Sequence, residues 1–481
     1  MSKLPYDPGD GRKFWEAIEK LPGYPAGESM PIPQMRFESD AVRRLTPVLK
    51  TAGAAADRAL VLVVDDTPMK RAGEDLKRLV EGLLKQDGWR VEPVVLKPDA
   101  TGQVHTDMPH IEQVRARLTP GCAVLSVGSG VVTDVAKHAC FLFEQAGGGR
   151  PPFVVFQTAN SVSAFTSNMA PTFVDGVKRT LDSRYPDALV CDLETLRDAP
   201  REMTVAGVGD MLAAFVSLPD LTLANALGMD PGYSGLARAL VGPLDEIFLE
   251  QAAPIRAGSL EGMAVLAKVI ALGGLAMSLS HATTPMSGLE HVMSHVLDLQ
   301  AETGDLPMPL HGTQVALTTL ICVEVYRHFL EEFDPAELRL ERCYPEAAAM
   351  QRQILASFAT LDPSGKAGAE CWSDYKLKLE AWGAHRKDFE AALRDWPRLV
   401  ARLREQTTSF ETLEKILREI DAPLTWSELT PPMDEARVRF AFMNASLMRK
   451  RLTVGDLLIF TGWDRERLWR QVWERGAALR R

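Results

Sequence analysis

Three of the nine histidines, His291, His295 and His311, fall close together in the sequence. His291 and His295 are four residues apart, so on a helix their side chains lie along one face. An aspartate, Asp210, follows a glycine-rich stretch further upstream. Imidazole and carboxylate groups are ligands that zinc, iron and nickel accept in proteins. These four residues could therefore form a site for one divalent ion.

Each of these residues also has an ordinary structural explanation. Asp210 and His311 could cap helices, His291 could be a core histidine with a hydrogen-bond partner, and His295 could lie on a solvated face. We expect residues 206–210 to open one helix, residues 287–295 to lie within a second, and residues 310–312 to open a third. Because three histidines cluster here, we give the metal hypothesis equal standing with these explanations.

A second pattern runs from Val124 to Lys137. An apolar run over 123–127 predicts a buried parallel strand, and Gly128 and Gly130 then predict a tight turn into a helix. The free N–H groups and the dipole at a helix N-terminus favour anions, so a phosphate or pyrophosphate would fit there. The full dinucleotide fingerprint needs a third glycine, which this chain lacks. A plain strand–helix connection is the alternative.

Two more predicted strands end in polar residues. The strand over 152–157 is followed by the hydroxyl and amide side chains of Thr158–Asn168, and ligands of open α/β sheets bind at such ends. A solvated turn is the alternative. The apolar strand over 59–64 ends at Asp65 and Asp66, where a carboxylate could meet a nucleotide ribose. An N-cap for a helix over 70–86 is the other explanation.

The predicted secondary structure that holds these residues differs between the N-terminal and the C-terminal parts of the chain. Strand and helix patterns alternate to about residue 195, which predicts a doubly wound parallel sheet. After Arg201 the periodicity is helical. We therefore predict an N-terminal extension (1–30), an α/β dinucleotide-binding domain (31–198) and an all-helical metal and substrate domain (199–481) with a helical insertion near 333–410. Asp175-Gly176 predicts a hairpin turn.

Further predicted elements complete this scheme. We expect strands over 35–37, 89–96 and 188–192, and helices over 13–20, 38–54 and 111–118. The apolar window 263–279 contains Lys268 and two glycines, which favours a buried helix over a membrane span.

The composition of this 481-residue chain limits the classes of molecule that we expect it to bind. It is 46% hydrophobic and 25% charged, with a formal net charge of −10. An acidic protein is a poor partner for nucleic acid or an anionic membrane, so we expect a small-molecule substrate. The six cysteines are scattered, which is typical of reduced thiols, and no apolar leader or membrane span is apparent. We therefore expect a cytoplasmic protein, and a homo-oligomer stays open.

Several motifs together resemble glycerol-1-phosphate dehydrogenase, of the superfamily that also holds iron-containing alcohol dehydrogenases, glycerol dehydrogenase and 3-dehydroquinate synthase. The similarity covers about residues 30–330 and 435–460. The matching segments are Gly128–Lys137, Thr158–Ser167, Val174–Thr180, Asp198–Asp210, Ser287–His295, Leu310–Gly312 and Arg449–Leu458.

The resemblance implies a dinucleotide-binding α/β half and a helical half with a cleft between them. It implies that Asp210, His291 and His311 hold a divalent ion, with zinc expected first and iron or nickel as alternatives, and that His295 contacts the substrate. It also implies NAD or NADP as the cofactor. The residues it assigns to cofactor binding are Asp65, Gly128, Ser129, Gly130, Asp134, Lys137, Thr158, Ala159, Asn160, Ser161 and Ser167.

The implied reaction transfers a hydride between nicotinamide and an alcohol carbon. The metal would act as a Lewis acid on the substrate oxygen, and Asp210, His291, His295 and His311 would be the catalytic residues. His295 is a candidate proton relay.

Three departures from the family concern the substrate. The family has an aspartate at Ser163, an arginine at Thr284 and a lysine near Ala214. We therefore predict a glycerol-1-phosphate dehydrogenase-type oxidoreductase whose substrate has drifted, with Ser163, Asp210 and His295 as substrate contacts. The alternatives are a 3-dehydroquinate synthase-like cyclase and a noncatalytic binding descendant. The sequence shows no clear arginine near Asp65 that would bind the 2′-phosphate of NADP, so it does not decide between NAD and NADP.

Overall fold

The structure, a computed structural model, describes residues 4–479 apart from residues 101, 175, 176, 231, 234 and 305. Its contacts divide the chain into two compact units. The first unit comprises Met1–Met211 and Ala239–His281, and the second comprises Leu212–Arg238 and Ala282–Arg481. The first unit thus includes α7 almost to its end and residues 239–281, which the sequence analysis assigned to the helical domain.

A six-stranded parallel sheet forms the centre of the first unit, in the order β1-β10-β7-β6-β2-β5. The strands are β1 (Gln34–Glu38), β2 (Ala59–Asp65), β5 (Arg90–Leu96), β6 (Ala123–Gly128), β7 (Phe153–Gln157) and β10 (Ala188–Asp192). After β2 the chain adds β5 on one side and then returns to add β6 on the other. The direction of winding therefore reverses between β2 and β6.

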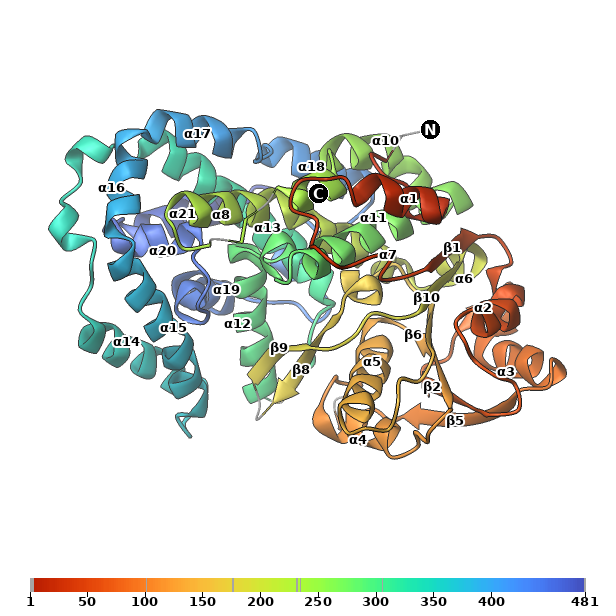
Figure 1. Ribbon diagram of the computed structural model, residues 1–481. Helices are drawn as coiled ribbons and strands as arrows, with labels where there is room; N and C mark the ends of the chain where they lie inside the picture. Colours follow the sequence, from red (N-terminus) through yellow and green to blue (C-terminus); the bar gives the residue numbers. More distant parts are fainter. Residues whose placement is uncertain are drawn as a thin grey trace. The chain divides into compact units, whose positions relative to one another are not determined.

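Helices cover both faces of this sheet (Figure 1). Leu60, Leu62 and Val64 of β2 belong to an apolar cluster with residues of α2 and α3, and α5 packs on the other face against β6. Every residue of β2 is buried, as expected for a parallel strand covered on both sides. The predicted doubly wound α/β fold is confirmed. The helices of this unit are α1 (Arg12–Ile18), α2 (Leu45–Thr51), α3 (Leu76–Gln86), α4 (Met108–Arg115), α5 (Gly130–Gln145), α6 (Leu193–Asp198), α7 (Arg201–Leu212), α10 (Leu244–Arg256) and α11 (Leu260–Leu279).

Some predicted element bounds were wrong. The helix expected over 70–86 begins only at Leu76, because Lys70–Arg71 (β3) and Glu74–Asp75 (β4) form a small hairpin around Gly73, whose φ is +87°. Asp75 caps α3, accepting from the N–H of Arg78. Asp65 is therefore not its N-cap. The helix expected over 38–54 is shorter, since a 3-10 turn precedes α2.

The predicted hairpin is present as β8 (Met169–Val174) and antiparallel β9 (Val177–Asp182). Its turn, Asp175-Gly176, lies outside the described residues.

Residues 206–210 do not open a helix. They form the later turns of α7, which starts at Arg201 directly after Pro200. Asp210 is therefore not an N-cap. Two helical stretches, Arg201–Ala226 and Leu260–Leu279, are long and apolar enough to cross a membrane, but their apolar windows are 100% and 78% buried inside the protein. Core helices pass the same test, so this is weak evidence for a membrane span.

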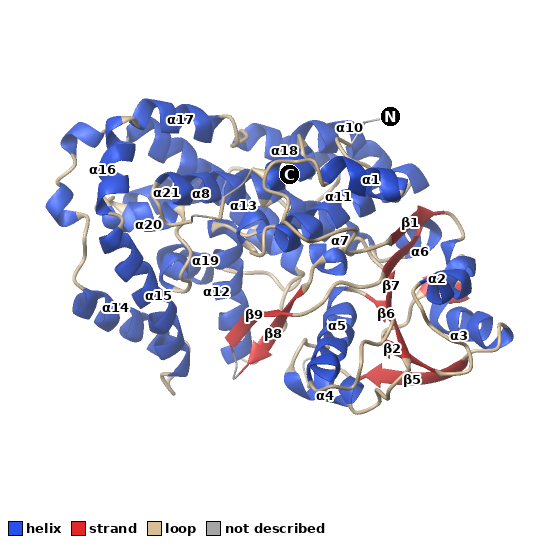
Figure 2. Ribbon diagram, in the orientation of Figure 1, coloured by secondary structure: helices blue, strands red, loops and turns tan. Residues whose placement is uncertain are grey.

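The second unit is helical over its described residues (Figure 2). Its long helix α13 is buried over most of its length and packs against α12, α18 and α21. The helices outside the first unit are α8 (Ala214–Ala226), α9 (Leu236–Val241, shared with the first unit), α12 (Leu289–Thr303), α13 (His311–Glu332), α14 (Ala347–Ala359), α15 (Lys366–Ala384), α16 (Arg386–Arg394), α17 (Trp396–Arg404), α18 (Phe410–Glu419), α19 (Glu435–Asn444), α20 (Val454–Phe460) and α21 (Arg465–Ala477).

Candidate active site

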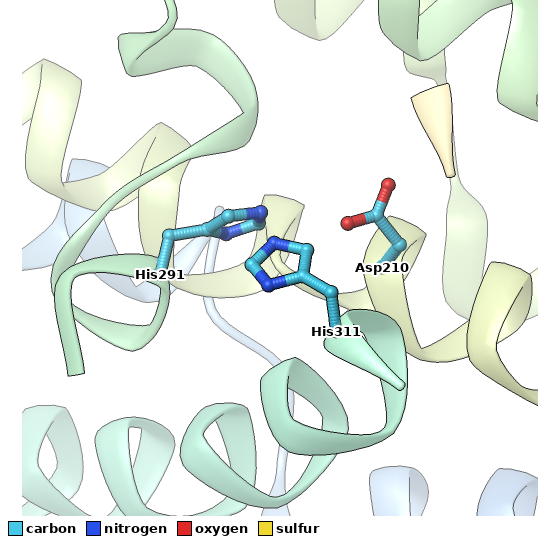
Figure 3. A group of neighbouring side chains, drawn as sticks. All are labelled: Asp210, His291 and His311. Carbon is cyan, nitrogen blue, oxygen red and sulfur yellow. The ribbon is translucent and has the colours of Figure 1, made fainter. Parts of the chain in front are cut away.

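Asp210, His291 and His311 point toward one another in the structure (Figure 3). Asp210 is near the end of α7, His291 is in the first turn of α12, and His311 is the first residue of α13. Each side chain offers one ligand atom, and the three atoms lie within 4.8 Å of one another. Asp210 and His291 are only 4% and 8% exposed. One carboxylate oxygen and two imidazole nitrogens at this spacing could hold a divalent ion, and three protein ligands is the number that catalytic zinc sites use.

A buried carboxylate orients His291. Glu290 is 0% exposed, and its Oε1 lies 2.9 Å from Nδ1 of His291. The same oxygen accepts a hydrogen bond of 2.7 Å from the N–H of Gly288. With Nδ1 protonated and facing Glu290, Nε2 of His291 carries the lone pair that a metal needs.

His311 has a similar but weaker support. Its Nδ1 lies 3.1 Å from the hydroxyl of Ser294 and 3.9 Å from Oδ2 of Asp298. The ring of His295 stacks on that of His311, with centroids 5.8 Å apart and planes at 16°. Its centroid is 6.2 Å from that of His291. The three histidines singled out in the sequence therefore form one cluster.

Asp220 of α8 braces the start of α12. Its carboxylate accepts hydrogen bonds from the hydroxyl of Tyr326 (2.6 Å) and the N–H groups of Leu289 and Val454 (2.8 Å each). Burial, together with the nearby charge of Glu290, raises the pKa of Asp220 to about 8. A protonated Asp220 lets a second buried carboxyl group lie close to Glu290 without charge repulsion.

Ser163 holds the side chain of Asp210. Both the N–H and the hydroxyl of Ser163 donate to Oδ2 of Asp210, at 3.1 and 3.2 Å. The 3-10 turn Ser163–Thr166 is itself held by Lys137, whose ammonium group donates to the carbonyls of Ala164 and Ser167 at 3.0 Å each. Lys137 is fully buried and pairs with Asp134 at 2.7 Å. A single buried lysine thus ties α5 to the turn that orients Asp210.

The glycine turn lies where the sequence predicted it, but the glycines are needed for another reason. Neither Gly128 nor Gly130 has a positive φ. Instead, a Cβ on Gly128 would lie 2.5 Å from Val132, and one on Gly130 would lie 2.5 Å from Val162. Ser129, at the N-cap, makes no side-chain hydrogen bond to the helix. The start of α5 is therefore left without a side-chain cap, and the N–H groups of such a helix end favour an anion.

Some side chains of the polar segment after β7 form hydrogen bonds within the protein. The side chain of Asn160 accepts from Gln157 at 2.8 Å and donates to the carbonyl of Met263 at 3.1 Å. The hydroxyl of Ser167 accepts from the N–H of Met169 at 3.1 Å. Thr158, Ala159 and Ser161 are buried beside them. The loop follows β7, next to the glycine turn after β6, at the same edge of the sheet.

Asp65 ends β2, the strand next to β6, and it has a partner that the sequence did not indicate. The ammonium group of Lys77 lies 2.7 Å from Oδ1 of Asp65. The sequence analysis placed Glu290 and Ser294 in a motif that resembles the family but gave them no role, and it did not single out Asp220. The signal available for Glu290 was its place directly before the candidate ligand His291.

The structure also places Ala214 and Thr284, two positions at which the sequence analysis expected a departure from the family. Ala214 is the first residue of α8 and is buried. Thr284 begins a 3-10 turn, and the segment around it is held by Arg451, which donates to the hydroxyls of Ser287 (2.7 Å) and Thr283 (3.1 Å). Burial lowers the pKa of Arg451 to about 10. Arg451, from the C-terminal segment, therefore lies beside Thr284.

Comparison with known proteins agrees with these observations. The family model "Iron-containing alcohol dehydrogenase" matches residues 36–200. The chain is 32% identical over 348 residues to a glycerol-1-phosphate dehydrogenase [NAD(P)+] of Halalkalibacterium halodurans, covering 70% of this chain and 80% of the relative. The chain belongs to the glycerol-1-phosphate dehydrogenase family. The relative of the same name from Bacillus subtilis is 31% identical over 283 residues, with 58% and 69% covered.

Solved structures show the same fold. Glycerol dehydrogenase from Schizosaccharomyces pombe matches with a TM-score of 0.54 at 13% identity, covering 92% of this chain and 90% of that one. An iron-containing alcohol dehydrogenase from Corynebacterium glutamicum matches with a TM-score of 0.51 at 16% identity, covering 94% and 97%. The predicted superfamily fold is therefore confirmed.

Proposed function

We propose that this chain is a metal-dependent, NAD(P)-linked dehydrogenase that interconverts glycerol 1-phosphate, or a closely related small alcohol, and the corresponding ketone. The observation that carries the proposal is the group of Asp210, His291 and His311, whose ligand atoms lie within 4.8 Å of one another. Family membership supports the same reaction class. We propose zinc as the ion, with iron or nickel as alternatives, because this mixed imidazole and carboxylate set suits all three.

The chain's own residues prepare this chemistry. When bound, the ion supplies a Lewis acid that stabilises negative charge on the substrate oxygen. Ser163 fixes Asp210 and Glu290 fixes His291, so two of the three ligands are held before the ion arrives. An imidazole can take or give a proton near neutral pH. We propose His295 for that role, since its ring lies beside those of His291 and His311.

The residues around the start of α5 suit the dinucleotide. Gly128, Ser129 and Gly130 form a turn with an uncapped helix end, and Thr158–Ser161 lie after the neighbouring strand β7. A pyrophosphate at that helix end is the arrangement that helix dipoles favour. We also propose a cytoplasmic location, which the six buried and scattered cysteines support.

The test measures metal content and turnover on the same preparations. Purified protein is analysed for metal by mass spectrometry, and oxidation of NADH or NADPH is followed with dihydroxyacetone phosphate and related ketones. We expect Asp210→Asn and His311→Ala to lose both the metal and turnover. His385→Ala, a half-exposed histidine paired with Asp388, is the matched control and should keep both.

Two outcomes would overturn the proposal. A metal-free Asp210 or His311 variant with full activity would refute the metal mechanism. Substrate turnover without net consumption of nicotinamide cofactor would instead indicate cyclase chemistry.

A further inference from the structure

The carboxyl ends of β2 and β6 border the place where the winding of the sheet reverses. Val63 pairs with Ser126 in the register of these two strands, so Asp65 and Gly128 lie two residues further along at the same edge. Ligands of open α/β sheets bind in the crevice at such a reversal. If the pyrophosphate lies at the start of α5, the adenosine ribose extends toward the end of β2. This inference rests on the proposed dinucleotide site.

An acidic residue at this position normally sets the choice of cofactor. A carboxylate accepts a hydrogen bond from the 2′-hydroxyl of NAD and repels the 2′-phosphate of NADP, which needs a cation instead. In this chain the carboxylate of Asp65 is nearly buried and has a cation against it, since Lys77 lies 2.7 Å away with only 18% of its side chain exposed.

Lys77 is held firmly in that position. Its ammonium group donates to Oδ1 of Asp65 (2.7 Å), to the carbonyl of Asp65 (2.6 Å) and to the carbonyl of Thr67 (2.7 Å). These three bonds use all of its donors. The pairing follows from the hairpin β3–β4, which shifts the start of α3 to Leu76 and places Lys77 in its first turn.

The carboxylate still has acceptor capacity for a ribose. Besides Lys77, Asp65 accepts only from the hydroxyl of Thr67, at 2.9 Å to Oδ2, among the hydrogen bonds of the described residues. A carboxylate has about four lone-pair sites, so roughly two remain. Next to it, Asp66 pairs with the exposed Lys97 at 3.3 Å. Two carboxylates and two ammonium groups therefore meet at this edge, and the local charge is balanced.

We propose that Lys77 makes the ribose pocket accept both NAD(H) and NADP(H). Asp65 accepts the ribose hydroxyl of NAD, and Lys77 cancels the repulsion that this carboxylate would exert on a 2′-phosphate. Lys77 is therefore a specificity-determining residue. Its loss leaves a bare carboxylate and restricts the pocket to NAD.

The test measures binding of two cofactor fragments, ADP and 2′,5′-ADP, by calorimetry, without any need for metal or substrate. For the native protein we expect dissociation constants within about tenfold of each other. For Lys77→Met we expect 2′,5′-ADP to weaken relative to ADP by about tenfold or more, because a full positive charge beside a dianionic phosphate is lost. Lys77→Arg should restore the native ratio.

Lys85→Met is the matched control, because Lys85 is on the same helix and pairs with Glu81 on the exposed surface. It should leave the ratio unchanged. A native protein that binds both fragments but rejects 2′,5′-ADP by a hundredfold would refute the role of Lys77, and so would a Lys77→Met variant with an unaltered ratio. If neither fragment binds to the native protein, the dinucleotide site of the proposed function fails as well.

Discussion

Replacing Glu290 with glutamine isolates the effect of one buried charge on metal binding. The side chain is 0% exposed, and its Oε1 contacts both Nδ1 of His291 and the N–H of Gly288. Glutamine has nearly the same shape and retains a carbonyl oxygen for these two contacts. Glu290→Gln therefore removes the charge behind His291 while it leaves the packing of α12 in place.

The expected loss follows from the hydrogen bond that changes. A hydrogen bond to a charged group contributes about 1.5–3 kcal/mol, and a neutral one about 1 kcal/mol. The difference of about 0.5–2 kcal/mol corresponds to roughly 2- to 30-fold in affinity. Loss of an outer-shell partner typically weakens metal binding by about 10- to 100-fold. We therefore expect the dissociation constant for zinc to rise about tenfold.

The fold should tolerate this change. The charge of Glu290 helps to raise the pKa of Asp220, so the two carboxyl groups repel each other when both are ionised. Removing one of the charges relieves that repulsion. We expect the melting temperature of the metal-free variant to stay at or above that of the metal-free native protein.

The assay is a competition titration of metal-free protein with zinc and a fluorescent chelator. Glu331→Gln is the control, because Glu331 is a half-exposed glutamate on α13 that pairs with Arg327. Glu331→Gln removes a negative charge as Glu290→Gln does, but at a residue that does not contact a proposed metal ligand. A folded Glu290→Gln protein whose zinc affinity stays within about twofold of native would refute the role assigned to Glu290, since the outer-shell range starts near tenfold.

Two further predictions concern stability. Gly207→Ala should lower the free energy of unfolding by about 1–3 kcal/mol in urea denaturation, because the added Cβ would overlap the carbonyl oxygen of Asn160. Gly82→Ala, with nothing within 4 Å, should be neutral or slightly stabilising, and equal effects of the two changes would contradict this account. The raised pKa of Asp220, about 8, means that the folded state keeps a proton that the unfolded chain releases near pH ~4. The contribution of this bound proton to the free energy of unfolding is complete below pH ~4 and is lost as the pH rises toward 8. The free energy of unfolding should therefore fall more steeply over this range in native protein than in Asp220→Asn, and parallel curves would refute this prediction.

Local sequence patterns were sufficient for most of the sheet. Buried parallel strands consist of apolar runs bounded by turn residues, so the strands over 59–64 and 188–192 were predicted nearly at their observed bounds. The start of α13 at His311 was also predicted. The start of a helix that depends on an unexpected hairpin was not predicted. The shift of α3 to Leu76 follows from the turn at Gly73, which the helical periodicity of 70–86 concealed.

The sequence by itself determined the chemical inventory of the site and the fold class. The clustering of histidines and the four-residue spacing of His291 and His295 made Asp210, His291, His295 and His311 candidates for a metal site, because these are local features. The resemblance to the family then pointed to Asp210, His291 and His311 as the ligands. Only the tertiary structure decided which side chains support them. Lys77 against Asp65, Ser163 against Asp210 and Lys137 under the turn at Ser163 join residues that are 12, 47 and 27 positions apart. Such contacts depend on how the elements pack, and packing is not encoded in the periodicity of any one segment.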